Sequence, residues 1–213
     1  DVYKRQIIHG AYKANVKNLI FLGSSCIYPK LSKQPIKENY ILSGKLEETN
    51  DAYAIAKIAG IKMCESYNLQ YKTNYKCLMP TNTFGPNDNY HPINSHVVAS
   101  LIRKFLIAKR DKLRSVTCWG TGLVYREFMH VDDLAEAAIF CLENWFPSKV
   151  TTPKDKFGNE LSYLNVGTGK DITIKELANK IASITNYEGE IHWDNSMPDG
   201  TSRKVLDLSL IHI

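Results

Sequence analysis

The sequence predicts an α/β fold, and two patterns along the chain support this prediction. Short apolar runs that suit buried strands alternate with longer segments in which apolar residues recur at helical spacing. Strands that alternate with helices in this way are typical of an α/β sheet covered by helices. The length of 213 residues suits one domain plus part of another, and the chain shows no internal repeat and no low-complexity tract.

Two predicted strands are each followed by a loop that carries polar or reactive residues. Residues 18–23 read as a short buried strand that opens into residues 24–29, which hold two serines and a cysteine. Residues 75–79 read as a second strand that opens into residues 80–88, which are rich in turn formers. Because ligands of α/β sheets sit at the carboxyl ends of the strands, we expect these two loops to face one site.

A helix with a tyrosine and a lysine one turn apart is expected between those strands. Residues 49–51 (Thr-Asn-Asp) offer capping side chains, and alanines and isoleucines continue the helix after Tyr53. Tyr53 and Lys57 then share one helix face. We expect the Lys57 ammonium to favour the phenolate of Tyr53 and to lower its pKa, which makes the hydroxyl a better proton donor near neutral pH. The pair alone is weak evidence, because an exposed helix turn can carry the same spacing.

The later chain continues the alternation. Helical spacing predicts helices over residues 97–110 and 131–144. A strand and its turn together are expected at 116–122, and a further strand at 163–166. Residues 147–160 are polar and read as a surface loop. The helix over 131–144 should bury one face, made of Leu134, Ala137, Ala138 and Cys141.

A glycine pair and a capping box follow the last of these strands. Gly167 and Gly169 are not a dinucleotide phosphate loop, because no third glycine follows at the fingerprint spacing, and we expect a strand-to-helix turn there. Thr173 and Glu176 fit a capping box at the start of a helix. The apolar positions of that helix are Ile174, Leu177, Ala178, Ile181 and Ala182.

Several motifs together resemble one family. From about Ile7 to Asp207 the chain resembles the extended short-chain dehydrogenase/reductases, and within them the nucleotide-sugar epimerase-reductases. The resemblance implies a partial Rossmann-like parallel sheet, with its first strands missing, and a smaller substrate domain. Residues 7–115 would be the second half of the NAD(P)-binding Rossmann domain, and residues 116–207 mainly the substrate-binding domain, with elements that return to the first. The motifs are Gly23-Ser24-Ser25-Cys26-Ile27-Tyr28-Pro29, Tyr53-Ala54-Ile55-Ala56-Lys57-Ile58-Ala59-Gly60, Pro80-Thr81-Asn82, His91-Pro92, Asn94-Ser95-His96, Arg126-Glu127-Phe128 and His130-Val131-Asp132-Asp133.

The resemblance implies NADPH-dependent 3,5-epimerisation and 4-reduction of GDP-4-keto-6-deoxy-D-mannose to GDP-L-fucose. The C4 ketone acidifies the hydrogens on C3 and C5, so inversion there needs a base and an acid on opposite faces of the sugar. By resemblance Cys26 is the base and His96 the acid. Tyr53 then protonates the oxyanion that forms at C4, Ser24 donates a hydrogen bond to it, and Lys57 holds the nicotinamide ribose.

Binding residues are carried over from the same resemblance. The expected NADP(H) contacts are Leu22, Gly23, Ser24 and Ser25 on the nicotinamide side, Lys57 on the ribose, Pro80, Thr81, Asn82 and Thr83 on the carboxamide side, and His96. On the substrate side, a diphosphate favours cationic side chains, and Lys104 and Arg126 fall where the family places phosphate contacts. By the same resemblance, Trp119 contacts the nucleotide portion of the substrate and Asp199 contacts the sugar or the guanine. For Asp199, a purely structural role in a turn is an equally good explanation.

Other interpretations of these residues stay open. Cys26 could be a small buried apolar residue, and His96 a surface or capping histidine. A metal site with His91 and Asp88 is disfavoured by the spacing, and a serine hydrolase by the absence of Gly-x-Ser-x-Gly, so no metal is expected. A related 4-epimerase or 4,6-dehydratase would share Ser24, Tyr53 and Lys57 without needing Cys26 and His96. A catalytically silent member of the fold is the more distant alternative.

Composition fits a reduced, cytoplasmic enzyme. The five cysteines form no Cys-x-x-Cys pair and are odd in number, which argues against a zinc site and a disulfide scaffold. The net charge is +5, and the densest basic cluster, residues 103–114, has Phe105 as its only aromatic, so we expect a solvated face and no nucleic-acid partner. No run of about 18 apolar residues predicts a membrane span. By resemblance, the intact protein is expected to be a homodimer.

The two ends of the chain are expected to be artefacts. Residues 1–6 and 208–213 can be written as inverted copies of each other at the codon level, which suggests a sequencing adapter read through as protein. The natural part is then residues 7–207. The resemblance places the glycine-rich loop and the determinant of NADP over NAD in front of it, so we expect the chain as it stands to bind no cofactor and to be inactive.

Overall fold

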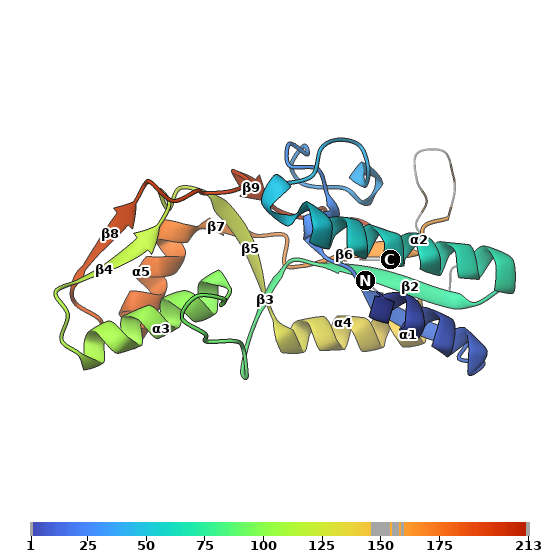
Figure 1. The fold of residues 1–213 in the computed structure, drawn as a ribbon, viewed down its shortest axis with the longest axis horizontal. Helices are drawn as coiled ribbons and strands as arrows, with labels where there is room; N and C mark the ends of the chain where they lie inside the picture. Colours follow the sequence, from blue (N-terminus) through green and yellow to red (C-terminus); the bar gives the residue numbers. More distant parts are fainter. Residues whose placement is uncertain (1, 146–153, 155–157, 159, 212–213) are drawn as a thin grey trace.

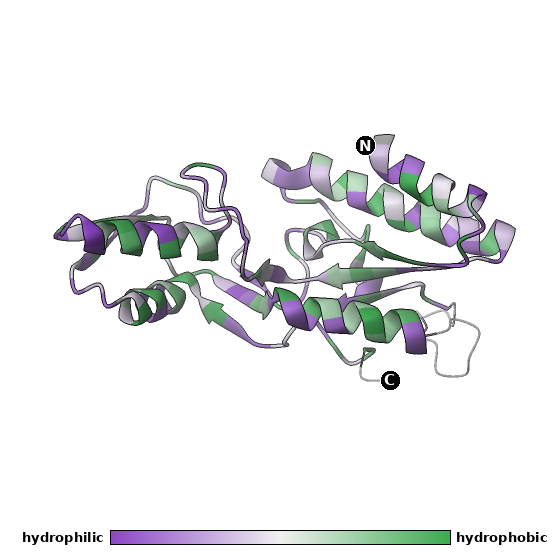
Figure 2. Cartoon of the chain, turned by 90° about the horizontal axis from the view of Figure 1, so that it is seen from below, coloured by the Kyte–Doolittle hydropathy of each residue, from purple (hydrophilic) through white to green (hydrophobic). Residues whose placement is uncertain are grey.

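The computed structural model describes residues 2–145, 154, 158 and 160–211. Its central element is a parallel sheet in the order β1-β2-β6, formed by β1 (Asn18–Leu22), β2 (Asn74–Pro80) and β6 (Tyr163–Val166). α1 (Val2–Lys13) and α2 (Asp51–Tyr71) cover one face of this sheet, and α4 (Val131–Asn144) covers the other (Figures 1 and 2). The predicted α/β fold is therefore confirmed.

A second group of elements lies beside this sheet (Figure 1). α3 (Val97–Arg110) and α5 (Ile174–Thr185) pack together, and β4 (Ser115–Trp119) pairs in parallel with β8 (Glu190–Asp194). They share a core of their own, in which Phe105 and Ala178 are fully buried. The core thus groups α3 with the later elements, while the predicted domain division at residue 115 stays a prediction.

β5 (Tyr125–His130) connects the two groups. Its last residues pair in parallel with β3 (Asn82–Phe84), directly after β2. Its first residues pair with β7 (Asp171–Thr173) and with β9 (Arg203–Lys204). Short 3₁₀ turns lie in the segment between β1 and α2, namely η1 (Ser25–Ile27), η2 (Glu38–Tyr40) and η3 (Glu48–Asn50). Residues from both groups therefore meet along one strand.

Most of the expected elements are confirmed. The strands at 18–23, 75–79 and 163–166 and the helices over 97–110 and 131–144 form where the sequence predicts them. The predicted strand and turn at 116–122 also forms, with β4 ending at Trp119. α4 buries Leu134 and Cys141, as its spacing indicates. The capping box of α5 forms in full, because Thr173 Oγ1 accepts from the Glu176 amide at 3.1 Å and Glu176 Oε2 accepts from the Thr173 amide at 2.8 Å.

Two local expectations are wrong, and one lies largely outside the described residues. Asn50, the N-cap of α2, makes no side-chain cap hydrogen bond, because a 3₁₀ turn leads directly into the helix, although the Asp51 carboxylate accepts from the Ala52 amide. The turn at Gly167–Gly169 leads into β7 rather than into a helix, because residues 171–173 pair with β5 first. Of the expected loop at 147–160, only residues 154, 158 and 160 are described. In the part of the chain that the structure describes, no helix is long and apolar enough to cross a membrane.

Candidate active site

Tyr53 and Lys57 lie near the start of α2, beside the carboxyl end of β1. Lys57 Nζ donates to the carbonyl oxygen of Leu22 at 2.6 Å and lies 5.6 Å from the centroid of the Tyr53 ring. Burial lowers the pKa of the Lys57 ammonium, and the nearby charge of Lys4 lowers it further. Lys57 is thus tied to the strand end rather than to the tyrosine hydroxyl.

The expected lowering of the Tyr53 pKa is wrong. The pKa of Tyr53 is raised above its ordinary value, mainly because burial disfavours the phenolate, with a smaller contribution from Cys26. A side-chain hydrogen bond with Ser24 acts in the opposite sense and lowers the pKa. Because the Lys57 ammonium points to the Leu22 carbonyl, it does not offset the burial. Tyr53 therefore keeps its proton at neutral pH and can donate it.

Ser24 and Cys26 are held together by a local cap. Ser24 is the N-cap of η1, and its hydroxyl oxygen accepts from the Cys26 amide at 3.1 Å. Ser25, between them, is 2% exposed. Cys26 is only half-buried, whereas the other four cysteines, Cys64, Cys77, Cys118 and Cys141, are buried. The interpretation as a small core residue fits those four better than it fits Cys26.

A buried polar network supports the loop that carries Cys26. The Tyr28 hydroxyl donates to Asn165 Oδ1 at 2.6 Å, and the Asn165 amide donates to Glu38 Oε1 at 2.9 Å. Asn165 Nδ2 also donates to the carbonyl oxygens of Ile36 and Asp207, at 2.9 and 3.1 Å. Burial raises the pKa of both Tyr28 and Glu38. Asn165, from β6, thus holds this loop through Tyr28, and no motif in the sequence pointed to it.

The second expected loop leaves the same edge of the sheet. β1 and β2 are parallel neighbours with Leu22 opposite Leu78, so their carboxyl ends lie side by side. Past that end, Thr81 Oγ1 and Asn82 Nδ2 both donate to the Glu127 carbonyl oxygen, at 3.0 and 2.9 Å. The loop of Pro80, Thr81, Asn82 and Thr83 is therefore anchored on β5, close to the loop of Ser24.

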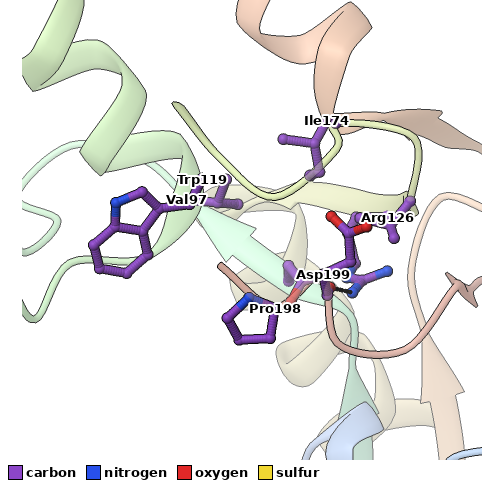
Figure 3. Close-up of a pocket in the computed structure, with 9 residues that line it drawn as sticks. Val97, Trp119, Arg126, Ile174, Pro198 and Asp199 are labelled. Atoms are coloured by element: carbon purple, nitrogen blue, oxygen red, sulfur yellow. Dashed lines mark hydrogen bonds between the residues drawn. The ribbon is translucent and has the colours of Figure 1, made fainter. Parts of the chain in front are cut away.

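The predicted substrate residues line two neighbouring cavities. The first measures about 200 Å³ and is lined by Trp119, Arg126 and Asp199 together with Asn82 (Figure 3). The second measures about 210 Å³ and is lined by Lys104 and again by Trp119. Both cavities also share Val97 and Ile174. The four predicted substrate residues come from α3, β4, β5 and the segment after β8, and the fold brings them together.

Asp199 is more than a turn residue. Its carboxylate accepts from the Thr121 amide at 2.8 Å and from the Thr121 hydroxyl at 2.7 Å. Its carbonyl oxygen accepts from Arg126 Nη2 at 3.1 Å (Figure 3). Burial lowers the pKa of Arg126, and the charges of Asp199, Cys26 and Glu47 raise it. Asp199 thus fastens one wall of the first cavity, and its carboxylate already has partners in the protein.

Lys104 lies in the middle of α3, and His96 lies directly before the helix. Lys104 Nζ donates to the Thr117 carbonyl oxygen at 3.0 Å and lies 5.6 Å from the Trp119 ring centroid. His96 is the exposed N-cap of α3, next to Val97 in the cavity wall, and its side chain makes no cap hydrogen bond. The capping role for His96 is therefore excluded. Among the described residues, no hydrogen bond joins the His96 side chain to Ser24, Cys26 or Tyr53.

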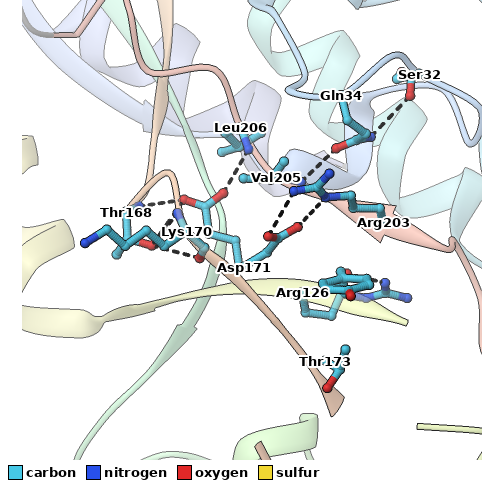
Figure 4. A network of polar contacts seen from close by, with 12 residues as sticks. Ser32, Gln34, Arg126, Thr168, Lys170, Asp171, Thr173, Arg203, Val205 and Leu206 are labelled. Atoms are coloured by element: carbon cyan, nitrogen blue, oxygen red, sulfur yellow. Dashed lines mark hydrogen bonds and ion pairs between the residues drawn. The ribbon is translucent and has the colours of Figure 1, made fainter. Parts of the chain in front are cut away.

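β9 is fixed to three parts of the chain, and it carries a residue that the sequence did not single out. Arg203 binds Asp171 through two contacts of 2.6 and 3.1 Å, and the Val205 amide donates to Gln34 Oε1 at 2.9 Å (Figure 4). Between them, Lys204 Nζ lies 3.6 Å from Cys26 Sγ. No motif pointed to Lys204, because its proximity to Cys26 comes from tertiary packing.

Glu127, on β5, holds the segment before β7 and the segment after β9. Glu127 is fully buried, and its Oε1 accepts from the amides of Thr168 and Gly169, the latter at 2.7 Å, while Oε2 accepts from the Leu206 amide at 2.9 Å. Burial raises the pKa of Glu127, and these amide donors act in the opposite sense. Among the described residues, no group of three or more His, Cys, Asp or Glu side chains could hold a metal ion.

Comparisons with known proteins agree on one family. The model of the NAD dependent epimerase/dehydratase family matches residues 2–150. The chain is 52% identical over 210 residues to a GDP-L-fucose synthase of Escherichia coli (strain K12), which covers 97% of this chain. The same match covers 63% of the E. coli protein, so the chain spans less than two thirds of that relative's length.

Solved structures show the same fold. A GDP-6-OMe-4-keto-L-xylo-heptose reductase from C. jejuni matches with a TM-score of 0.89 and 36% identity, over 98% of this chain and 68% of that one. A GDP-mannoheptose C4 reductase from Campylobacter jejuni with NADP bound matches with a TM-score of 0.83 and 37% identity, over 98% of this chain and 65% of that one.

Proposed function

Because the chain belongs to the NAD-dependent epimerase/dehydratase family, we propose that its protein converts GDP-4-keto-6-deoxy-D-mannose to GDP-L-fucose by 3,5-epimerisation and NADPH-dependent 4-reduction. The observation that carries this proposal is the grouping of Ser24, Cys26, Tyr53 and Lys57 at the carboxyl end of β1. The likeness to the E. coli GDP-L-fucose synthase supports the choice of substrate.

The residues at the strand ends fit NADP(H). Leu22 and Tyr53 are 43% and 44% exposed, so an open surface lies beside the half-buried Lys57, where a nicotinamide and its ribose need apolar contact and hydrogen-bond donors. The residues proposed to hold NADP(H) are Leu22, Gly23, Ser24, Ser25, Lys57, Pro80, Thr81, Asn82, Thr83 and His96. When bound, the cofactor supplies a hydride to C4 of the sugar. The relative with NADP bound supports this choice of cofactor.

In the reduction, Tyr53 acts as the proton donor. Its raised pKa keeps the hydroxyl protonated, and the side chain of Ser24 is hydrogen-bonded to it. As negative charge develops on the C4 oxygen, Tyr53 transfers its proton to that oxygen and Ser24 donates a hydrogen bond to it. Lys57 keeps the end of β1 in place through Leu22.

In the epimerisation, Cys26 removes a proton from carbon and His96 returns one to the opposite face. The C–H bond at C3 or C5 breaks, its electrons pass into the enolate of the C4 ketone, and the Cys26 sulfur takes the proton. His96 is exposed at the end of α3, so its side chain is accessible to a sugar that enters between the two groups of elements.

The nucleotide part of the substrate is assigned to the two cavities. Arg126 offers a planar guanidinium in the first cavity and Lys104 an ammonium in the second, which suits the two phosphates. Trp119 is 60% exposed and offers a ring face to the base. Asp199 orders one wall of the first cavity through Thr121.

A cytoplasmic homodimer is part of the proposal. The five cysteines are free, which suits a reducing compartment. Ile55 and Leu69 of α2 are exposed apolar residues, which supports a second copy of the protein as partner.

The experiment follows NADPH oxidation by the full-length natural protein with GDP-4-keto-6-deoxy-D-mannose and identifies the sugar formed. GDP-L-fucose supports the proposal. No turnover by a folded protein that binds NADPH would favour the alternative, a related enzyme for another GDP-sugar, which the likeness to the heptose reductase supports.

A further inference from the structure

Lys204 lies beside the sulfur of Cys26. The distance from Lys204 Nζ to Cys26 Sγ is 3.6 Å, which is within hydrogen-bonding range for a sulfur acceptor. Lys204 is half-buried, as Cys26 is. The two residues come from segments 178 positions apart, so only the fold brings them together.

The backbone of Lys204 is fixed on both sides. Arg203 is bound by Asp171 through two hydrogen bonds, and the amide of Val205 donates to Gln34 Oε1. One residue further, the amide of Leu206 donates to Glu127. These contacts fix the backbone from which the Lys204 side chain extends toward Cys26. The placement of Lys204 next to Cys26 therefore follows from how β9 is held.

The surroundings of Cys26 are electropositive. Lys204 faces it from β9, and Arg126 faces it from β5, close enough that the charge of Cys26 raises the pKa of Arg126. Tyr53 faces it from α2 and is neutral. The other carboxylate that acts on Arg126 besides Asp199 is Glu47, which forms its own ion pair with Lys30 at 3.1 Å. Within the described residues, no ion pair joins Lys204 to a carboxylate.

We propose that Lys204 is a positioning residue that holds Cys26 in its thiolate form, ready to act as the base of the epimerisation. A cation within about 4–6 Å favours an anionic partner, and the thiolate, not the thiol, can accept a proton. Removing a proton from C3 or C5 returns Cys26 to the thiol and leaves the electron pair on the sugar, and Lys204 again favours release of that proton. The catalytic use of this pair rests on the proposed function, but the pairing of Lys204 with Cys26 is testable without substrate.

The first test measures alkylation of Cys26 by iodoacetamide in the full-length natural protein, followed by mass spectrometry of the peptide that contains Cys26. The other four cysteines are buried, so Cys26 is the accessible one of the five. Lys204→Met removes the charge and keeps the length, Lys204→Arg restores a charge, and Lys33→Met, at an exposed position, is the matched control. Thermal unfolding confirms that each variant is folded.

We expect Lys204→Met to slow alkylation near pH 7 by about fivefold to tenfold, as loss of a partly screened neighbouring cation implies. The rates of the two proteins should converge at high pH, where both sulfurs are ionised, and Lys204→Arg should restore most of the rate. Equal rates at every pH, or a rate lowered by the same factor at every pH, would overturn the proposal.

The second test separates this role from substrate binding. Lys204→Met should slow exchange of solvent deuterium into the sugar while the KM for the GDP-sugar changes little. A raised KM with unchanged alkylation would show that Lys204 contacts phosphate instead, and the proposal would be wrong. If alkylation depends on Lys204 but the wild-type protein turns over no GDP-4-keto-6-deoxy-D-mannose, the proposed function fails and the pairing stands.

Discussion

Lys57 donates its hydrogen bond to the carbonyl oxygen of Leu22, at 2.6 Å, and not to the hydroxyl of Tyr53. The lysine thus links α2 to the end of β1, where the Ser24 loop begins. Its charge still lies 5.6 Å from the Tyr53 ring, but the balance of burial and neighbours leaves the tyrosine protonated. Lys57 therefore acts on the site mainly through the position of the strand end.

Replacing Lys57 should weaken the binding of NADPH more than it slows the chemical steps. In Lys57→Met the Leu22 carbonyl loses its donor and the ribose loses a proposed partner, so we expect the Kd for NADPH to rise by about tenfold or more, as loss of a charged hydrogen bond implies. Fluorescence titration with NADPH measures this. Lys62→Met, on an exposed turn of the same helix, is the control. An unchanged Kd for NADPH in Lys57→Met would remove Lys57 from the proposed cofactor site.

Removing the Tyr53 hydroxyl should separate reduction from epimerisation. We expect Tyr53→Phe to lower the rate of NADPH oxidation by about 10²-fold to 10⁴-fold, the usual contribution of a positioned proton donor. Exchange of solvent deuterium into C3 and C5 of the substrate should persist, because Cys26 and His96 remain. Loss of both activities together in a folded variant would contradict these separate roles.

The contact between Thr121 and Asp199 should matter for the nucleotide sugar alone. Thr121→Val keeps the shape of the side chain and removes the hydroxyl that donates to Asp199 at 2.7 Å. One neutral-to-charged hydrogen bond lost from the cavity wall should raise the KM for the GDP-sugar by about tenfold. The Kd for NADPH should stay unchanged, because among the described residues Thr121 makes no hydrogen bond to either predicted cofactor loop. Equal effects on both ligands would show a general loss of structure instead.

Buried Glu38 should make stability depend on pH in a specific direction. Burial raises the folded-state pKa of Glu38 above its ordinary value of 4.5. The stabilisation associated with the protonated form is present below that ordinary value and is lost as the pH rises through the raised one. Glu38→Gln keeps an acceptor for the Asn165 amide and does not titrate. Urea unfolding from about pH 4 to pH 7 should therefore show Glu38→Gln gaining stability relative to wild type. A difference that stays constant over this range would contradict the raised pKa.

Local signals predicted the parts of the fold that local physics determines. The helices over 97–110 and 131–144 and the capping box of Thr173 and Glu176 form as predicted, because helical spacing and capping act within one segment. β3, β7 and β9 were not predicted, since each has only two or three residues and exists because β5 offers a partner. The turn at Gly167 was misassigned for the same reason.

In the candidate active site, too, sequence motifs predicted some residues, while others are placed only by tertiary packing. Ser24, Cys26, Tyr53 and Lys57 sit in motifs that the sequence displays, and the structure groups them at one strand end. Lys204 and Asn165 sit in no such motif, and their contacts with Cys26 and with Tyr28 depend on how distant segments pack. The direction of the Tyr53 pKa also depended on burial, which spacing along a helix does not reveal.

The most direct test of the epimerase-reductase account is the mass of the product formed in D₂O from GDP-4-keto-6-deoxy-D-mannose and NADPH. The account predicts GDP-L-fucose that carries solvent deuterium at both C3 and C5, because Cys26 and His96 exchange those hydrogens before C4 is reduced. A reduced GDP-sugar without carbon-bound deuterium would identify a simple 4-reductase and contradict the account.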